Sequence, residues 1–79
     1  MNEIIYDREA LAFGRTYLIR YRAGSRILRR RLECLDHGVY LERLAAHGPD
    51  PFTTHPRSRI EERRIFIGED EFISATEAS

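Results

Sequence analysis

Arginine is the residue type in this sequence best suited to binding chemistry. All thirteen basic residues are arginine and none is lysine, and thirteen acidic residues balance them. Seven arginines lie between Gly14 and Leu32, a stretch without any acidic residue, whereas Gly68–Ser79 holds four acids and no base. Each guanidinium is a planar, permanently charged donor that suits carboxylates and phosphates. The basic stretch is therefore a candidate site for an anionic partner.

The residues around these arginines predict a β-hairpin that would position them. Apolar and polar residues alternate from Arg15 to Arg22, as in a strand with one buried face. Gly24-Ser25 then fits a two-residue type II′ turn, which needs glycine at the position with positive φ. This turn sets the register of the two strands. The expected cross-strand pairs are Ala23–Arg26, Tyr21–Leu28, Ile19–Arg30 and Tyr17–Leu32.

This register sorts the hairpin into two faces. The expected core face consists of Tyr17, Ile19, Tyr21, Leu28, Leu32 and Cys34, with Arg30 as an exception that snorkels or pairs with a carboxylate at a barrel end. The expected outer face consists of Leu18, Arg20, Arg22, Ile27, Arg29 and Arg31. Arg20 faces Arg29 directly, and like charges opposed on a sheet are destabilising by roughly 0.2–1 kcal/mol a pair. Such a cluster needs an anion.

Three sources of that anion remain open. The phosphates of RNA or DNA would bind Arg20, Arg22, Arg29 and Arg31, although nucleic-acid surfaces usually also carry aromatics and the tyrosines here point to the other face. An acidic protein surface would bind the same four arginines. The third source is an internal Arg–Glu lattice, for which the neighbouring strands offer Glu33, Glu42, Glu61 and Glu62.

The rest of the chain also reads as short strands separated by glycine-containing turns. Ile4–Phe13 is expected to start extended and to form one short helical turn capped by Asp7. Asp36-His37-Gly38 is expected to be a second turn, with glycine in a left-handed conformation. The later expected elements are a strand at Val39–Leu44, a loop at Ala45–Ser58 with all three prolines, a strand at Arg59–Ile67, a last strand starting at Phe72-Ile73, and a frayed tail at Thr76–Ser79.

Apolar residues on the expected surface indicate a protein contact. The triplet Ile65-Phe66-Ile67 covers both faces of its strand, so that one face must pack outside the core. Leu18 and Ile27 lie on the arginine face. A homodimer would cover these groups, and a lid formed by residues 1–13 or by the proline-rich loop is the alternative. The candidate interface residues are Leu18, Ile27, Ile65, Phe66 and Ile67.

Several other functional classes find little support in the sequence. No nucleophile with a placed base and no glycine-rich phosphate loop is present, so we expect neither an enzyme nor a cofactor. The spacing of Cys34, His37, His47 and His55 matches no standard zinc motif, so no metal site is expected. The single cysteine excludes an intrachain disulfide and favours a reducing, cytoplasmic setting. No segment resembles a signal peptide or a membrane span.

The order of these features resembles small SH3-like and Sm-like barrels, and within that group the Rho-binding antiterminator type. The resemblance rests on Tyr6-Asp7, on the strand–glycine turn–strand of Tyr17–Leu35, on Tyr40-Leu41, and on Arg64–Ile67 leading into Phe72-Ile73. It covers nearly the whole chain but is one of pattern, and the basic hairpin and the proline-rich loop depart from it. It implies binding of RNA or of an RNA-handling protein without catalysis.

The sequence thus predicts one small, mostly β domain over residues 1–79. Its expected architecture is an antiparallel barrel or curled sheet of four to five strands that works by binding. Recognition of RNA or DNA through the arginine face and the loop at residues 45–58 is the first hypothesis. A self-associating protein-interaction or adaptor module that binds no nucleic acid is the alternative.

Overall fold

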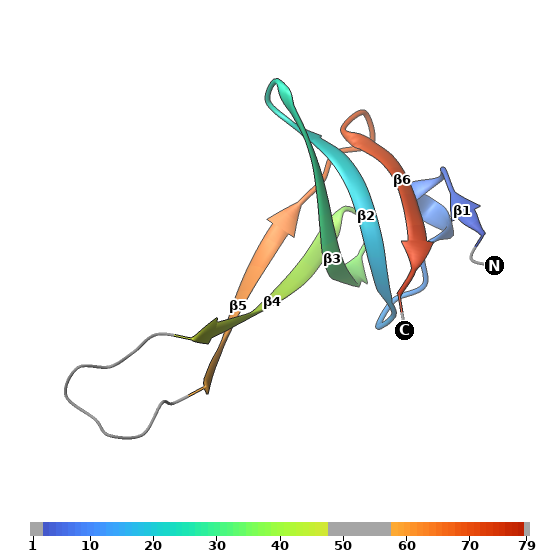
Figure 1. Cartoon of the computed structure of the whole chain (residues 1–79). Helices are drawn as coiled ribbons and strands as arrows, with labels where there is room; N and C mark the ends of the chain where they lie inside the picture. Colours follow the sequence, from blue (N-terminus) through green and yellow to red (C-terminus); the bar gives the residue numbers. More distant parts are fainter. Residues whose placement is uncertain (1–2, 48–57, 79) are drawn as a thin grey trace.

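The protein is mostly antiparallel β-strand, as the sequence predicts (Figure 1). The computed structural model describes residues 3–47 and 58–78, with side chains described for 3–44 and 61–78. The elements are β1 (Ile4–Ile5), the 3-10 turn η1 (Arg8–Ala10), β2 (Thr16–Ala23), β3 (Arg26–Asp36), β4 (Val39–His47), β5 (Ser58–Phe66) and β6 (Phe72–Glu77). They form one sheet in the order β1-β6-β2-β3-β4-β5.

The sheet is curled and retains two edges in the part of the chain that the structure describes. Strands β2 to β5 follow one another as a meander, and β6 then returns to pair with β2. In Figure 1, β2, β3 and β6 form a curved layer, and the β4–β5 hairpin projects away from it. The turn at Gly68–Glu71 connects β5 to β6. In this turn the Glu71 N–H donates to the Gly68 carbonyl, and the Glu71 carbonyl accepts from the Arg22 N–H on β2.

The start of the chain forms both elements expected of it. The Asp7 carboxylate accepts a hydrogen bond from the Glu9 N–H and caps η1. The extended start, Ile4–Ile5, pairs with β6 and adds a sixth strand to the four or five expected. A strand of two residues is too short to show an alternating pattern of apolar and polar residues in the sequence, so only its pairing with β6 identifies it.

The register of the β2–β3 hairpin is confirmed at every expected pair. Tyr21 lies opposite Leu28, Tyr17 opposite Leu32, and Arg20 opposite Arg29. Gly24 has φ 63°, the positive value that the two-residue turn requires. The turn and the alternation of apolar residues specify the same register, which explains why local sequence was sufficient to predict it.

The core lies on the predicted face of this hairpin. Its buried members are Leu11, Tyr17, Ile19, Tyr21, Leu32, Cys34, Tyr40, Ile67 and Ala75. Leu28, expected in the core, is half-buried and packs against its margin. Arg30, the exception on this face, reaches the carboxylate of Glu42, with 4.0 Å between Nε and Oε2. This contact confirms the expectation that Arg30 pairs with a carboxylate.

Two strands run further than the sequence indicated. Strand β4 continues to His47, with Ala45–His47 paired to Ser58–Ile60, so the expected loop at 45–58 begins later; its residues 48–57 lie outside the described residues. Strand β6 continues to Glu77, and the Ala78 N–H donates to the Thr16 carbonyl, so the expectation of a frayed tail was wrong for 76–78. Thr76 is paired on both sides, with Ile4 and Leu18, which holds this end in the sheet.

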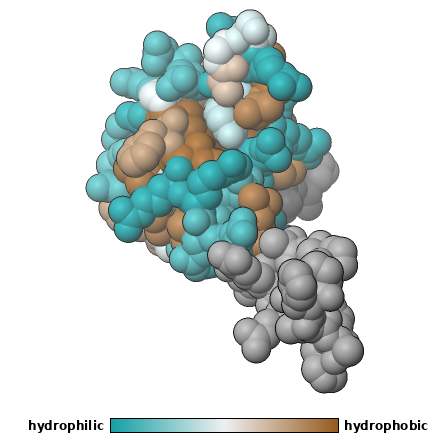
Figure 2. Space-filling model, turned by 90° about the vertical axis from the view of Figure 1, so that its left-hand side faces the viewer, coloured by the Kyte–Doolittle hydropathy of each residue, from teal (hydrophilic) through white to brown (hydrophobic). Residues whose placement is uncertain are grey.

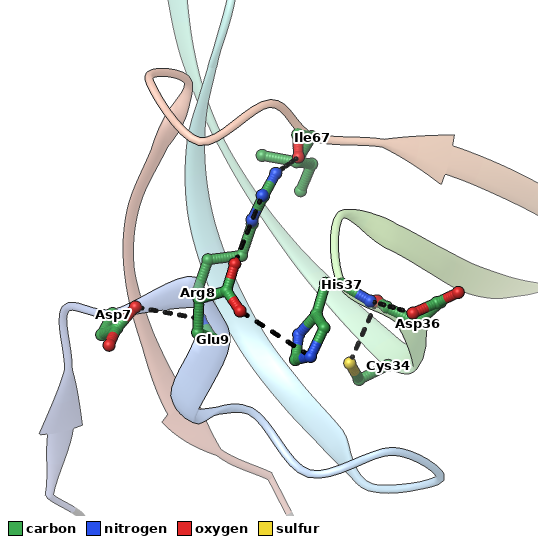
Figure 3. A network of polar contacts seen from close by, with 7 residues as sticks. All are labelled: Asp7, Arg8, Glu9, Cys34, Asp36, His37 and Ile67. Atoms are coloured by element: carbon green, nitrogen blue, oxygen red, sulfur yellow. Dashed lines mark hydrogen bonds and ion pairs between the residues drawn. The ribbon is translucent and has the colours of Figure 1, made fainter.

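Arg8 links η1 to the residue that follows β5 (Figure 3). Its Nη1 donates to the Ile67 carbonyl at 2.9 Å, and its Nη2 lies 3.8 Å from the Glu9 carboxylate. Gly38, with φ 82°, turns the chain directly beneath it: a Cβ at this position would lie 2.9 Å from Arg8 Nη1 and 3.0 Å from the Ile67 oxygen. The turn therefore needs glycine for its φ and for the space.

We expect Gly38→Ala to lower the free energy of unfolding by about 2–4 kcal/mol, because it adds crowding against a backbone carbonyl to the cost of positive φ. Gly24→Ala is the matched control, since Gly24 also has positive φ but has no atom within 4 Å of the added Cβ. It should cost only about 1–2 kcal/mol. Urea unfolding of both variants measures the difference. Equal losses would show that the contact with Arg8 and Ile67 contributes nothing.

Tyr40 is fully buried, and its hydroxyl makes no hydrogen bond of normal geometry within the described residues. Burial, followed by the nearby Cys34 thiol, raises the pKa of Tyr40 to about 12, although Arg8 and the Gly38 N–H act in the opposite direction. The unfolded phenol has its ordinary pKa of about 10. The folded state therefore holds this proton more tightly.

The stability that this proton provides is complete below about pH 10 and is lost as the pH rises from about 10 through about 12. We expect a loss of roughly 2–3 kcal/mol over that range, measured by urea unfolding at successive pH values. Tyr40→Phe should lack this component and cost little at neutral pH, because within the described residues the hydroxyl has no hydrogen bond of normal geometry to lose. An unchanged alkaline loss in Tyr40→Phe would contradict the assignment.

Candidate nucleic-acid interface

The outer faces of β2 and β3 bring three of the four predicted binding arginines together without a carboxylate partner. Arg20 and Arg29 face each other across the hairpin, and Arg22 lies one pleat further towards the turn. All three are exposed. Within the described part of the chain none of them forms an ion pair or a side-chain hydrogen bond. The like-charge pair at positions 20 and 29 is thus not neutralised within this region.

Arg31, the fourth predicted arginine, differs from these three. It lies on the same face, opposite Leu18, and it already takes part in an interaction with another residue. It also lines a hollow of about 300 Å³ together with Glu33 and Arg43. Arg31 therefore lies at the boundary between the unpaired arginines and the ion pairs described next.

An Arg–Glu lattice does form, but it lies to one side of the unpaired arginines. Arg43 on β4 donates from Nη1 to Glu33 at 2.9 Å and from Nε to Glu62 at 3.4 Å. The carboxylate of Glu33, and after it that of Glu62, raises the pKa of Arg43. These ion pairs link β3, β4 and β5 through Arg43, and within the described residues they do not reach Arg20, Arg22 or Arg29, which the expected lattice was to neutralise.

A shallow hollow of about 450 Å³ adjoins the unpaired arginines. It is lined by Ile4, Leu18, Arg20, Arg29, Ser74, Ala75 and Thr76. Ser74 pairs with Arg20 across the β2–β6 ladder, and Thr76 pairs with Leu18. Two guanidinium groups, two hydroxyl-bearing residues and an apolar wall therefore meet at one depression. Such a surface can bind an anionic group and an apolar or aromatic group at the same time.

Sequence reasoning missed the β1 and β6 contributors to this hollow. Ser74, Thr76 and Ile4 are distant from the hairpin in the chain, and the return of β6 to the free edge of β2 brings them there. Their residue types are ordinary for strands. The only signal in the sequence was the short apolar run at Phe72-Ile73, which predicted a last strand without indicating its neighbour.

The residues proposed as a protein interface are divided by the structure. Phe66 and Ile27 are strongly exposed, whereas Leu18 and Ile65 are half-buried. Ile67 is buried in the core, so it cannot contribute to an interface. Ile65 lies on the same inward face as Ile67, and Phe66 is therefore the one residue of the triplet that points outwards. On the face drawn in Figure 2, apolar residues lie visible between hydrophilic side chains.

Cys34 and His37 lie close to Arg8 and Glu9 (Figure 3). Cys34 is buried and its Sγ donates to the Asp36 carbonyl at 3.5 Å. Burial and, secondarily, the Asp36 carboxylate raise the pKa of its thiol. The His37 ring contacts Phe13 edge-on and lies 3.8 Å from the Glu9 carboxylate. Among the described residues no three His, Cys, Asp or Glu side chains form a metal-binding group, and His55 lies outside them.

No helix in the described ranges is long and apolar enough to cross a membrane. Comparison with known proteins finds no matching protein-family model, no significantly similar curated protein and no significantly similar solved structure. The functional argument therefore rests on the geometry of the surface itself.

Proposed function

We propose that this protein is a non-enzymatic binding module that recognises RNA or DNA through the outer face of its β2–β3 hairpin. The observation that carries the proposal is the Arg20–Arg29 pair. The two arginines are cross-strand neighbours with no carboxylate partner in the described structure, and both line a hollow that Ser74 and Thr76 also line. A phosphate between them would relieve their repulsion and accept hydrogen bonds from both.

The composition of the hollow favours a nucleic acid over a simple anion. Ser74 and Thr76 offer hydroxyl groups for phosphate or sugar oxygens, and Leu18 and Ile4 offer an apolar wall beside them. Arginine side chains can also stack on bases. The resemblance to small Sm-like and SH3-like barrels and the curled six-stranded sheet agree with this proposal. A reducing cytoplasm is its proposed setting, since the single cysteine is buried and unpaired.

Binding of labelled oligonucleotides tests the proposal. The measurement is the fluorescence anisotropy of a short oligouridine, of the corresponding single-stranded DNA and of a duplex, each at a series of salt concentrations. Engagement of two to four arginines predicts a slope of log K against log salt of about −1.4 to −2.8 for the single strands. Absence of binding to all three probes at low salt would refute the proposal.

The second candidate function is a protein-interaction module. The exposed side chains of Ile27 and Phe66 support it, because large apolar groups are common at the centre of protein interfaces. Purification of the protein from cells separates the two candidates. Bound material that absorbs at 260 nm and is lost at high salt supports the nucleic-acid proposal, and a bound protein retained at high salt supports the alternative.

A further inference from the structure

Strand β5 forms one edge of the sheet (Figure 1). It spans nine residues, Ser58–Phe66, and pairs with β4 along one side only. Within the described residues nothing pairs with its other side. A long strand edge presents unsatisfied N–H and C=O groups that can pair with another strand. This edge is therefore a candidate interaction surface, separate from the arginine face on β2 and β3.

The backbone of β5 identifies which residues face the free side. The Ile67 N–H donates to the Gly38 carbonyl on the β4 side. Consecutive residues of a strand direct their N–H and C=O groups to opposite sides, so the backbone groups of Ile65 and Arg63 also point towards β4. Glu62, Arg64 and Phe66 therefore present their backbone groups to the free edge, and their side chains share the outer face of the sheet.

We propose that β5 pairs with β5 of a second copy of this chain, antiparallel and centred on Arg63. In an antiparallel pair of strands, residues that lie opposite each other have their side chains on the same face of the sheet. When the two strands are identical and related by a two-fold axis, this requires the axis to pass through one residue, which then lies opposite the same residue of the second copy. Centring on Arg63 places Glu62 of each copy opposite Arg64 of the other. The outward backbone groups of these residues then form the hydrogen-bonded pairs.

Charge and exposure favour this register over the one centred on Glu62. Arg64 is exposed and has no carboxylate partner in the described structure, and Phe66 is 72% exposed. The register centred on Arg63 places Arg64 opposite Glu62 of the second copy and Phe66 opposite Ile60. Centring on Glu62 would instead oppose two glutamates and leave Arg64 opposite Ile60.

The like-charge contact in the proposed register is already compensated. Arg63 faces Arg63 of the second copy, but each is hydrogen-bonded to the buried Glu42 of its own chain. The centre of the interface therefore contains two guanidinium groups and two carboxylates. The two flanking Glu62–Arg64 pairs add opposite charges on the outer face, where each Glu62 also accepts a hydrogen bond from Arg43 of its own chain.

Charge reversal in β5 tests the proposal by sedimentation equilibrium of the full chain. The wild type should show a concentration-dependent dimer in the micromolar range. In the dimer, Arg64→Glu turns both Glu62–Arg64 pairs into pairs of glutamates, and Glu62→Arg turns both into pairs of arginines. Each substitution should therefore weaken the dimer about tenfold or more. An equimolar mixture of the two variants restores both opposite-charge pairs and should form a heterodimer as tight as the wild type.

Two further variants keep the test decisive. Arg64→Pro removes an outward N–H without touching the β4–β5 hydrogen bonds, and should abolish the dimer while circular dichroism stays unchanged. Glu69→Arg, an exposed charge reversal in the β5–β6 turn, should leave the dimer intact. A monomer mass at all concentrations would overturn the proposal, and so would a dimer that survives Arg64→Pro. Failure of the mixture to recover would overturn the Arg63-centred register.

Discussion

The double substitution Arg20→Glu with Arg29→Glu should reduce the affinity for single-stranded RNA roughly a hundredfold or more. Each guanidinium is expected to make a charge-assisted hydrogen bond to phosphate worth about 1.5–3 kcal/mol, and both are replaced by repelling carboxylates. Fluorescence anisotropy at constant salt measures the loss. The salt slope should fall in magnitude by about 1.4, since two phosphate contacts are removed.

The control for this experiment is Arg15→Glu with Arg26→Glu. It changes the net charge of the protein by the same amount but replaces arginines that do not line the hollow at Arg20 and Arg29. We expect it to weaken binding only modestly, through the long-range field. Equal losses in the two double variants would mean that RNA senses the overall charge of the hairpin, and that the Arg20–Arg29 site is not specific.

The single variant Arg29→Glu separates stability from binding at the same position. It converts an opposed Arg–Arg pair into an opposed Arg–Glu pair, so the free energy of unfolding should rise by about 0.5–1 kcal/mol while RNA affinity falls. A surface on which an unfavourable pair is retained despite a simple stabilising alternative is characteristic of a functional site. Loss of stability on this substitution would contradict that interpretation.

Removal of the Arg63 guanidinium is expected to destabilise the fold through the carboxylate that it leaves behind. Glu42 is 3% exposed on the core face of β4, where it is hydrogen-bonded to Arg63 on β5. Arg30 stands further off, with 4.0 Å between its Nε and the carboxylate. Arg63→Met would leave a buried carboxylate with this one distant partner. We expect a loss of about 2–4 kcal/mol in the free energy of unfolding, measured in urea at pH 7.

The double variant Glu42→Leu with Arg63→Met should recover most of that loss. It removes the buried Glu42 carboxylate together with its partner Arg63, whose side chain is 58% exposed, so no buried charge is left unpaired. Arg43→Met provides the comparison, because its carboxylate partners Glu33 and Glu62 are more exposed than Glu42, and its loss should cost no more than about 1 kcal/mol. A double variant as unstable as Arg63→Met would show that Glu42 is not the origin of the effect.

The amino-acid sequence alone determined the features that depend on neighbouring residues. The β2–β3 register follows from a glycine turn that permits positive φ and from the alternation of apolar residues, both of which are local. The same holds for the Asp7 cap, for the Gly38 turn and for the opposition of Arg20 to Arg29. The outer arginine face was therefore predictable from a few residues on either side of Gly24.

Only the tertiary structure decided which distant elements meet that face. The return of β6 to β2 places Ser74 and Thr76 beside Arg20, and the pairing of β4 with β5 places Arg63 against Glu42. It also directs Arg43 to Glu33 and Glu62, and leaves Arg20 and Arg29 without a carboxylate in the described structure. Strand neighbours far apart in the chain are selected by the burial of the whole core, and an alternating pattern carries no information about which neighbour a strand will take.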